Sequence, residues 1–364
     1  ANHAVVDVAA WFTTNPVAGF TYRDVTSVAL DRDGSGLGVA VALNGSVVNV
    51  GGTDYTNTIP QQGRVVFFDL NTGTVLGSLP VGYHPDMVTI KGGRIAIANE
   101  AEHAWNGSGV DIAAFDGVQQ PGSVSVIDAT AVNAGNLATF DFSTLVVNTV
   151  DFSAVPALIS GLRDHTSFEA ANTKDKYFHI EPEYIAFSPD TTKLFVTLQE
   201  NNAVATLDLT TLTWDNVTNL GQRPVTIDAS DNDDLFDVSN AALGMPMPDS
   251  IATWEKDGNT YVITADEGDA RVDDGDIQRF ASAATTFGLA SGFTPSTNNN
   301  DFGRLNVLKD QCLNGPVDPA SDIDKIVSMG SRGLSLWKKE TDGSVSFVSH
   351  LPLETELFNR DPQR

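Results

Sequence analysis

The chain has 364 residues, of which 41% are hydrophobic, and it carries a formal net charge of −26 with a sequence pI of about 4.3. Such acidity argues against a nucleic-acid partner, because a phosphate backbone requires Lys and Arg clustered on one face. No apolar run approaches the roughly 20 residues of a membrane-spanning helix, and the length fits a single domain, residues 1–364.

One pattern recurs along the chain: a short strand, a tight turn, a second strand and then a third strand. An alternating segment at 5–12 precedes the copies, and we expect it to be a strand that closes the last repeat. The four copies cover residues 24–30, 38–43 and 64–70; residues 84–90, 94–98 and 123–128; residues 184–187, 193–198 and 203–209; and residues 247–253, 261–265 and 304–308. A degenerate fifth copy follows at 325–330, 334–337 and 344–350.

Long insertions separate these strands. We expect loops near 104–122, 131–177 and 268–302, with short helices at 155–162 and 168–172 within the second of them. Loops of this length in a compact fold carry function or cover an edge. An acidic run at 228–237 precedes the fourth copy, and its spacing fits a solvated loop and not an EF-hand.

Repeated units of this kind indicate an all-β chain that forms a β-propeller of four-stranded blades. Three copies end their third strand with an aspartate, at Asp69, Asp128 and Asp208, a residue that bonds the backbone where a strand ends. Four copies and a partial one are too few for the commonest closed rings. We therefore expect about seven blades in the full protein and an incomplete ring in this chain.

Carboxylates occupy equivalent positions in successive copies. Pro85, Pro182 and Pro248 each open an inner strand, where proline fixes φ and donates no hydrogen bond, and an acid follows each of them. Further acids end the second strands. Acids that meet at one channel mouth would repel each other unless a cation lay between them. The candidate metal ligands are therefore Asp86, Glu100, Glu181, Glu183, Glu200, Asp249, Asp266, Glu267 and Asp269.

Calcium fits this set best, because it takes about six to eight oxygen ligands and the candidates are almost wholly oxygen donors. Another divalent metal in place of calcium stays an open alternative. Zinc or iron would favour imidazole, which is present near these motifs only at His84, His103 and His179. A plainer interpretation also stays open, in which the acids pair with arginines such as Arg271 and Arg332 or stay hydrated at an open rim.

No catalytic residue can be assigned from a motif. The chain has no Gly-rich phosphate loop, no GxSxG elbow and no HExxH sequence, and no spacing of Ser and His singles out a triad. The single cysteine, Cys312, excludes an internal disulfide and fits a buried or idle thiol.

Four segments carry a resemblance to a known family: EPEY at 181–184, VTLQENNA at 196–203, TADEGDAR at 264–271 and GSRGLSLW at 330–337. Over residues 20–350 the chain resembles the choice-of-anchor I family, which includes mesenchyme-specific cell surface glycoprotein-like proteins and bacterial chains labelled alkaline phosphatase. The resemblance implies an exported, surface-associated propeller in an extracellular, cell-surface or periplasmic location. It also implies that family members continue beyond the point where this chain stops.

Two functions from different classes follow. The first is a non-catalytic extracellular or cell-surface propeller, stabilised by calcium, that binds an unidentified partner or assembles with itself through its long loops. The alternative is a metal-dependent phosphoesterase, alkaline phosphatase-like or phytase-like, in which clustered carboxylates hold cations that clamp a phosphate and activate water. In that case Arg271 would contact phosphate oxygens and His179 would serve as the acid.

Overall fold

The computed structural model describes residues 25–42, 62–101, 120–163, 175–269 and 276–360. The chain divides into two compact units. Unit 1 contains residues 1–159, 175–196 and 207–214, and unit 2 contains residues 160–174, 197–206 and 215–364. The strand predicted at 5–12 lies outside the described residues.

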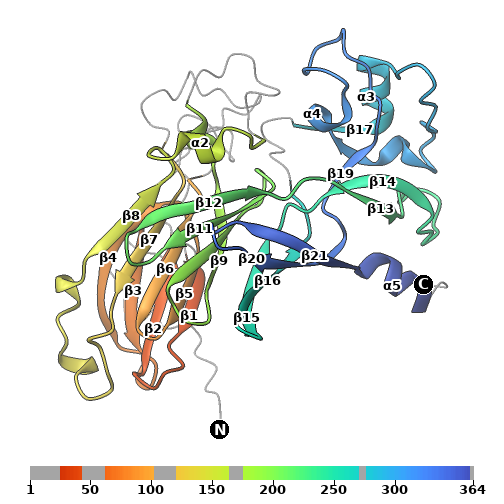
Figure 1. The fold of residues 1–364 in the computed structure, drawn as a ribbon. Helices are drawn as coiled ribbons and strands as arrows, with labels where there is room; N and C mark the ends of the chain where they lie inside the picture. Colours follow the sequence, from red (N-terminus) through yellow and green to blue (C-terminus); the bar gives the residue numbers. More distant parts are fainter. Residues whose placement is uncertain (1–24, 43–61, 102–119, 164–174, 270–275, 361–364) are drawn as a thin grey trace, which may run out of the picture. The chain divides into compact units, whose positions relative to one another are not determined.

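Unit 1 contains two antiparallel sheets in which strands that follow each other in sequence also pair with each other (Figure 1). The first sheet consists of β1 (Val25–Leu30), β2 (Leu37–Ala42), β3 (Gln62–Asp69) and β4 (Val75–Tyr83). The second consists of β5 (Pro85–Lys91), β6 (Arg94–Asn99), β7 (Ser123–Asp128) and β8 (Val147–Asp151). This four-stranded meander is the blade of a β-propeller, so the predicted fold class is confirmed.

A third sheet has the same order. It consists of β9 (Pro182–Phe187), β10 (Lys193–Leu198), β11 (Ala203–Asp208) and β12 (Thr213–Asn219), and the boundary between the two units passes within it. The first three strands of all three sheets agree with the predicted copies to within a few residues. The fourth strands were not predicted, and β8 lies within the stretch expected to be a loop at 131–177.

The aspartates that end the third strands act as the sequence predicts. The Oδ1 atoms of Asp69, Asp128 and Asp208 each accept a hydrogen bond from the backbone N–H two residues on, at 2.8, 3.0 and 2.7 Å. These bonds turn the chain out of the third strand and into the connection to the fourth.

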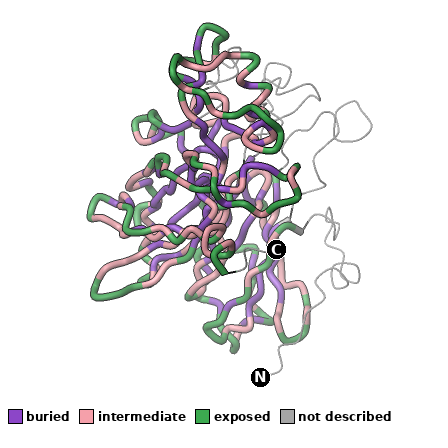
Figure 2. The backbone as a smooth tube through the Cα atoms, turned by 90° about the vertical axis from the view of Figure 1, so that its right-hand side faces the viewer, coloured by how far each residue is buried: buried purple, intermediate pink, exposed green. Residues whose placement is uncertain are grey.

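Alternating apolar residues of the strands form the core of unit 1. Val39, Val65, Phe67, Ile95 and Ile97 are fully buried within one hydrophobic cluster. The burial map shows the same arrangement, with buried residues along the strands and exposed residues at the turns (Figure 2).

Short helical segments connect the strands of unit 1. Two 3-10 turns, η2 (Leu137–Thr139) and η3 (Phe142–Thr144), precede β8, and a third, η5 (Lys176–His179), precedes β9. The helix α2 (Pro156–Ile159) lies within the helix predicted at 155–162.

Unit 2 contains a blade of β15 (Ser250–Lys256), β16 (Asn259–Asp266), β20 (Gly333–Lys339) and β21 (Val345–Pro352). The predicted third strand of this blade, at 304–308, is therefore wrong. β18 (Asn306–Leu308) instead pairs with β17 (Ile277–Arg279). The apolar alternation of β20 suits the partner of β16 equally well, and the prediction chose the segment that is nearer in sequence.

The degenerate fifth copy is not a blade of its own. Its second and third segments are β20 and β21, whereas β19 (Val327–Met329) pairs in parallel with β14 (Asn240–Met245), beside β13 (Arg223–Ile227). Three short helices, α3 (Phe280–Phe287), η6 (Phe302–Arg304) and α4 (Lys309–Cys312), accompany these strands, and α5 (Leu353–Arg360) follows the blade.

A second hydrophobic cluster fills the space between these helices and strands. It includes Ile227, Phe280, Val307, Cys312 and Val327. Cys312 is buried, as the sequence predicts, and burial raises the pKa of its thiol to about 12.

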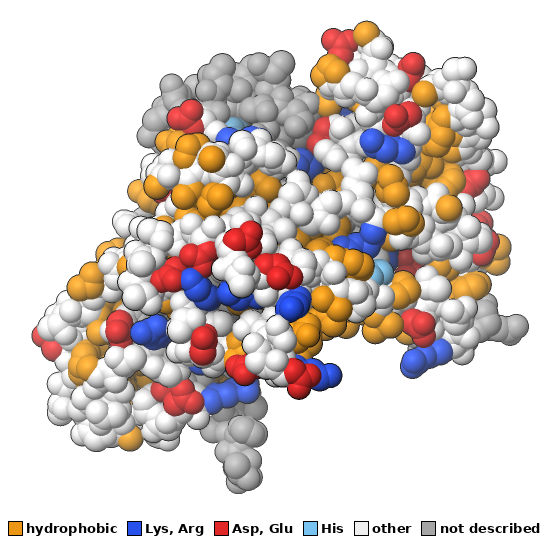
Figure 3. All heavy atoms as spheres, in the orientation of Figure 1, with side chains coloured by type: hydrophobic (Ala, Val, Ile, Leu, Met, Phe, Trp, Pro, Cys, Tyr) orange, Lys and Arg blue, Asp and Glu red, His pale blue; other side chains and the backbone are white. Residues whose placement is uncertain are grey.

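The surface does not show a separate basic patch on the face drawn in Figure 3, where Lys and Arg side chains lie among Asp and Glu side chains. In the described ranges, no helix combines the length and the apolar content that a membrane crossing requires.

Candidate functional site

Two of the family-like segments meet at Asp266, the last residue of β16, whose side chain is fully buried. Its Oδ2 atom accepts hydrogen bonds from the hydroxyls of Ser331, at 2.5 Å, and of Ser335. Its Oδ1 atom accepts a hydrogen bond from the Thr264 hydroxyl at 2.7 Å. Fixed donors therefore stabilise the carboxylate charge, and the TADEGDAR and GSRGLSLW segments are joined through one side chain.

The backbones of these two segments also touch. Gly268 and Gly330 have φ values of +81° and +70°, in the left-handed region that favours glycine. A Cβ atom added to Gly268 would collide with the Gly330 backbone, and one added to Gly330 would collide with the carbonyl of Glu267. Both positions therefore require glycine for two independent reasons.

The VTLQENNA segment joins the same region of unit 2 through Asn202, which is fully buried. The Asn202 side-chain oxygen accepts a hydrogen bond from the Met247 N–H at 2.9 Å, and its Nδ2 donates to the Gly221 carbonyl at 2.8 Å. The Met247 carbonyl in turn accepts a hydrogen bond from the Gly268 N–H at 3.1 Å. Three of the four family-like segments thus form one connected joint, which we call the Asp266 joint.

A partly buried arginine and a partly buried histidine face the joint. Arg223 Nη1 lies 3.9 Å from Asp266 Oδ2 and donates to the Ser335 hydroxyl at 2.6 Å, with its guanidinium 5.3 Å from the centre of the Trp337 ring. Burial lowers the pKa of Arg223, and the charge of Asp266 opposes this effect. Burial and then the charge of Arg223 lower the pKa of His350, whose Nδ1 lies 3.7 Å from Asp266 Oδ2.

Ser335, His350 and Asp266 do not form a catalytic triad. In a triad the histidine lies between the serine and the aspartate. Here the Ser335 hydroxyl bonds to Asp266 directly and lies 3.2 Å from His350 Nδ1. Because Ser335 is also fully buried, the arrangement holds the blade together and does not present a nucleophile.

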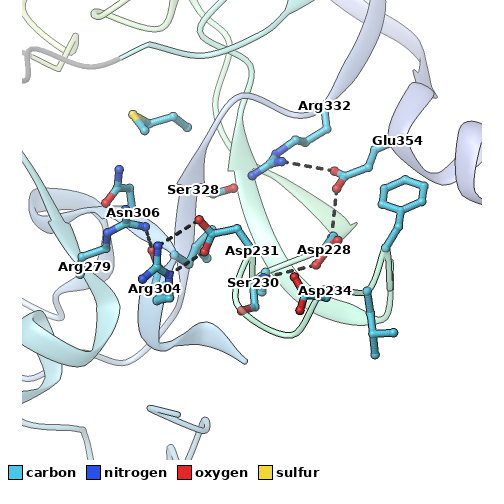
Figure 4. A pocket seen from close by; sticks show the side chains of 15 residues that line it. Asp228, Ser230, Asp231, Asp234, Arg279, Arg304, Asn306, Ser328, Arg332 and Glu354 are labelled. Atoms are coloured by element: carbon cyan, nitrogen blue, oxygen red, sulfur yellow. Dashed lines mark hydrogen bonds and ion pairs between the residues drawn. The ribbon is translucent and has the colours of Figure 1, made fainter. Parts of the chain in front are cut away.

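A cavity of about 610 Å³ lies next to the joint within unit 2. Its volume is in the range of small-ligand pockets. The residues that line it come from the loop between β13 and β14, from β17 to β19, from Arg332 and from the start of α5 (Figure 4): Asp228, Ala229, Ser230, Asp231, Asp234, Leu235, Phe236, Arg279, Arg304, Leu305, Asn306, Ser328, Met329, Arg332 and Glu354. The predicted acidic loop at 228–237 is therefore one wall of a cavity.

Two acidic residues of this cavity, Asp231 and Glu354, contact residues of other segments that line it. Both carboxylate oxygens of Asp231 accept hydrogen bonds from the Arg304 guanidinium, at 2.6 and 3.0 Å, and this contact lowers the pKa of Asp231. Glu354 Oε1 accepts a hydrogen bond from the Asp228 N–H at 3.1 Å, and Glu354 Oε2 lies 3.6 Å from Arg332 Nη1. Burial raises the pKa of the Asp228 carboxyl.

In unit 1 the structure brings two of the predicted acids to His84. Its Nδ1 lies 3.4 Å from Glu100 Oε2, and Glu181, which is buried, acts on it electrostatically. Burial lowers the pKa of His84 to about 4, and Glu181 only partly opposes that effect. His84 is therefore neutral at physiological pH.

The remaining candidate ligands divide between the units. In unit 1, Asp86 and Glu183 are partly buried on β5 and β9. In unit 2, burial and then the charge of Asp269 raise the pKa of Asp249, so these two carboxylates lie within electrostatic reach of each other. Glu267 and Asp269 are exposed, and Glu200 is buried. The meeting of all nine acids at one mouth stays a prediction.

Across the described ranges, no group of three or more His, Cys, Asp and Glu side chains is arranged to hold a metal ion. Calcium takes about six to eight oxygen ligands. A calcium ion at any of these carboxylates would therefore have to take most of its ligands from main-chain oxygens and water.

Sequence reasoning missed a buried ion cluster in unit 2. The Arg163 guanidinium contacts Asp276 Oδ2 at 2.6 Å and Asp310 Oδ2 at 2.9 Å, and all three side chains are at most 4% exposed. Burial alone would lower the pKa of Arg163, but its contacts with the two carboxylates outweigh burial and raise it. Arg163 stands alone in its stretch of sequence, so no local pattern marks it.

The two residues assigned to the phosphoesterase alternative gain no support. His179 is fully buried, and Arg271 lies outside the described residues.

Meandering four-stranded blades place the chain in the β-propeller class. A family model, the Choice-of-anchor I domain, matches residues 4–364. The chain therefore belongs to the choice-of-anchor I domain family, as its motifs predict, and the match extends further than the predicted 20–350 at both ends. This membership indicates a surface or extracellular propeller module.

Solved structures resemble the chain only distantly. Hydrazine synthase of Kuenenia stuttgartiensis is 13% identical with a TM-score of 0.33, over 65% of this chain and 54% of that one. A functionally unknown protein from Desulfotomaculum acetoxidans is 13% identical with a TM-score of 0.32, over 90% and 55% of the two chains. The β-propeller domain of Myceliophteria thermophila Cps50 (Swd1) is 9% identical with a TM-score of 0.30, over 90% and 72%.

This chain thus spans about half the length of the first two of these structures. No curated protein matches the sequence.

Proposed function

We propose that the chain is a surface or extracellular propeller module that binds a partner molecule and does not turn over a substrate. One observation carries the proposal: Asp266, in the family-like TADEGDAR segment, accepts three hydroxyl hydrogen bonds and faces Arg223. A carboxylate engaged in this way would have to break those bonds before it could act as a base or hold a phosphate-bound cation. Family membership supports the location.

Turnover tests this proposal against the phosphoesterase alternative. Purified protein is incubated with p-nitrophenyl phosphate in the presence of Ca²⁺, Mg²⁺ or Zn²⁺, with and without chelator. We expect hydrolysis no faster than in buffer. Hydrolysis that is lost in Glu267→Gln and retained in Glu255→Gln, another exposed glutamate of unit 2, would establish the phosphoesterase instead.

Calcium remains part of this proposal, with Asp249 and Asp269 as its side-chain ligands. Burial and then the charge of Asp269 raise the pKa of Asp249, and this supports the assignment, because a bound cation would relieve the repulsion between the two carboxylates. Another divalent cation would act in the same way.

Thermal melts with added Ca²⁺ or with EGTA test the cation. We expect Ca²⁺ to raise the melting temperature of the wild-type chain and not that of Asp249→Asn. The matched control is Asp257→Asn, an exposed aspartate in the turn between β15 and β16, which should respond like wild type. Equal melting temperatures of the wild-type chain in Ca²⁺ and EGTA would remove calcium from the proposal and leave partner binding in place.

A further inference from the structure

Three arginines line the cavity beside the Asp266 joint, in a chain that has only 21 Lys and Arg against 47 Asp and Glu. Arg304 is engaged by both oxygens of Asp231. Arg279 donates to the Arg304 carbonyl and acts electrostatically on the Asp231 carboxylate, but in the described ranges it forms no ion pair with a carboxylate. Arg332 lies 3.6 Å from Glu354, which is too long for a hydrogen bond.

Two guanidinium groups therefore keep most of their donors. Each guanidinium has about five N–H donors, arranged as a planar fork that matches a carboxylate or phosphate. Figure 4 shows Arg332 reaching the cavity beside Glu354, whereas Arg279 and Arg304 reach it from another side. The unused donors favour an anionic group on the ligand.

The backbone of Arg332 is a second, independent observation. Arg332 has a φ of +56°, a region that non-glycine residues rarely occupy. Hydrogen bonds hold its peptide groups on both sides: its N–H donates to the Asp266 carbonyl at 3.2 Å, and its carbonyl accepts from the Glu354 N–H at 3.3 Å. Eight other described non-glycine residues also have positive φ, so the value alone does not mark a ligand site. The two hydrogen bonds matter because they fix the position from which the Arg332 side chain reaches the cavity.

The other lining groups suit hydroxyls. Asn306 and Asp234 offer acceptors to the cavity, and Asn306 also offers an amide donor. Phe236 offers an apolar face, and its ring packs edge-on against Phe358 of α5 at 5.6 Å. Four carboxylates line the cavity as well, those of Asp228, Asp231, Asp234 and Glu354, and they repel any anionic group. A polyhydroxy ligand can offset this repulsion by donating its hydroxyls to carboxylate oxygens, and a bare inorganic anion has far fewer donors to offer.

We propose that this cavity binds a small polyhydroxy ligand that carries one carboxylate or phosphate group, of the chemical class of acidic sugars. The anionic group lies against one of the two guanidinium groups, Arg279 or Arg332, and the other guanidinium donates to the ligand's hydroxyls. Other hydroxyls bond to Asn306 and Asp234. This ligand class deepens the proposed function and rests on it, because it names what one face of the binding module recognises.

Isothermal titration of the full chain at low salt tests the proposal with glucuronate, glucose 6-phosphate, glucose, inorganic phosphate and glycine. We expect glucuronate or glucose 6-phosphate to bind, and glucose, phosphate and glycine to bind at least about 10-fold more weakly, because a charge-assisted hydrogen bond is worth that factor or more. Whichever of the two acidic sugars binds tighter identifies the anionic group.

Two variants assign the binding to the cavity. Arg332→Asn removes the guanidinium with a residue that tolerates positive φ, and Arg279→Gln removes the other one. Each should weaken binding at least about 10-fold. The control is Arg360→Gln, which makes the same change of charge at an exposed position on α5 and should bind like wild type. If Arg332→Asn fails to fold, as judged by its melting temperature, Arg279→Gln decides alone.

Four results would overturn the assignment: no binding of either acidic sugar, equal affinity for inorganic phosphate, binding of glycine in preference to both sugars, or unchanged affinity in the folded variants. The titration involves neither calcium nor turnover. If neither acidic sugar binds, the proposed binding module is therefore unaffected. If the protein hydrolyses a phosphoester, the proposal of a non-catalytic module is wrong, but the ligand assigned to the cavity is not thereby excluded.

Discussion

Replacement of Asp266 by asparagine tests whether the joint in unit 2 depends on a buried charge. Asparagine has nearly the same shape as aspartate, but it is neutral and presents an NH₂ group in place of one acceptor oxygen. In the native chain both oxygens accept hydroxyl hydrogen bonds. In Asp266→Asn, the new NH₂ group would therefore face one or two of the hydroxyls that donate to the native carboxylate. The change would also remove the negative charge that faces Arg223.

The expected loss of stability follows from the burial of this pair, in which the Asp266 side chain is fully buried and the partly buried Arg223 side chain is 12% exposed. Removing one partner of a buried ion pair costs about 3–5 kcal/mol. We expect the lower end, about 3 kcal/mol, because Arg223 keeps its hydrogen bond to Ser335 and its contact with the Trp337 ring after the change. The serine hydroxyls can also rotate to new acceptors.

Urea unfolding followed by tryptophan fluorescence measures this loss. Trp337 is a suitable reporter, because it is 3% exposed and its Nε1 donates to the Thr264 hydroxyl at 2.9 Å. Asp257→Asn, at an exposed turn, is the control and should change the free energy of unfolding by less than about 0.5 kcal/mol. A loss below about 1 kcal/mol in Asp266→Asn would refute the role of the buried charge, since it would lie within the range of an ordinary neutral hydrogen bond.

Three further changes test other parts of the molecule. Arg163→Met leaves two buried carboxylates without their cation and should cost about 3–5 kcal/mol in urea unfolding; a cost below about 1 kcal/mol would contradict this. His84 has its pKa lowered from 6.5 to about 4, so protonation favours the unfolded chain between these values. The free energy of unfolding should therefore be highest above pH 6.5 and should fall by about 3 kcal/mol as the pH drops from 6.5 to below 4. His84→Asn should abolish this part of the pH dependence. Gly268→Ala should lower the free energy of unfolding by about 2–4 kcal/mol, because of the left-handed backbone and the collision of the new Cβ atom with the Gly330 backbone. The control Gly258→Ala has positive φ but open space around it, and should cost only about 1–2 kcal/mol. Equal shifts of the melting temperature in the two variants would disprove the collision.

The strands of the blades could be predicted where partners follow each other closely. β5 and β6, for example, are apolar segments joined by a tight turn, so their pairing is local. The partner of β16 could not be found in this way, because β20 follows only after the whole insertion that contains α3 and α4. Local alternation identifies a strand but carries no information about a distant partner.

The candidate site divides in the same way. The sequence identified Asp266 and its repeated neighbours as important, but it assigned a cation as their partner. The structure gives Asp266 the hydroxyls of Ser331 and Ser335, which belong to the GSRGLSLW segment. The sequence identified both segments but not their contact, because they lie far apart along the chain. Arg279 and Arg304 could not be identified as cavity residues from the sequence, since single arginines in an insertion match no motif.

The joint and the cavity are physically one structure. The Asp266 side chain holds Ser331, and the Asp266 carbonyl holds the N–H of Arg332, the next residue. The close contact of Gly268 with Gly330 fixes the same segment one residue earlier. Arg332 is therefore placed in the cavity by contacts that its own side chain does not make. Because rigid support allows a ligand to meet a pre-formed guanidinium, the TADEGDAR segment can serve binding without touching the ligand, by holding Arg332 of the GSRGLSLW segment in place.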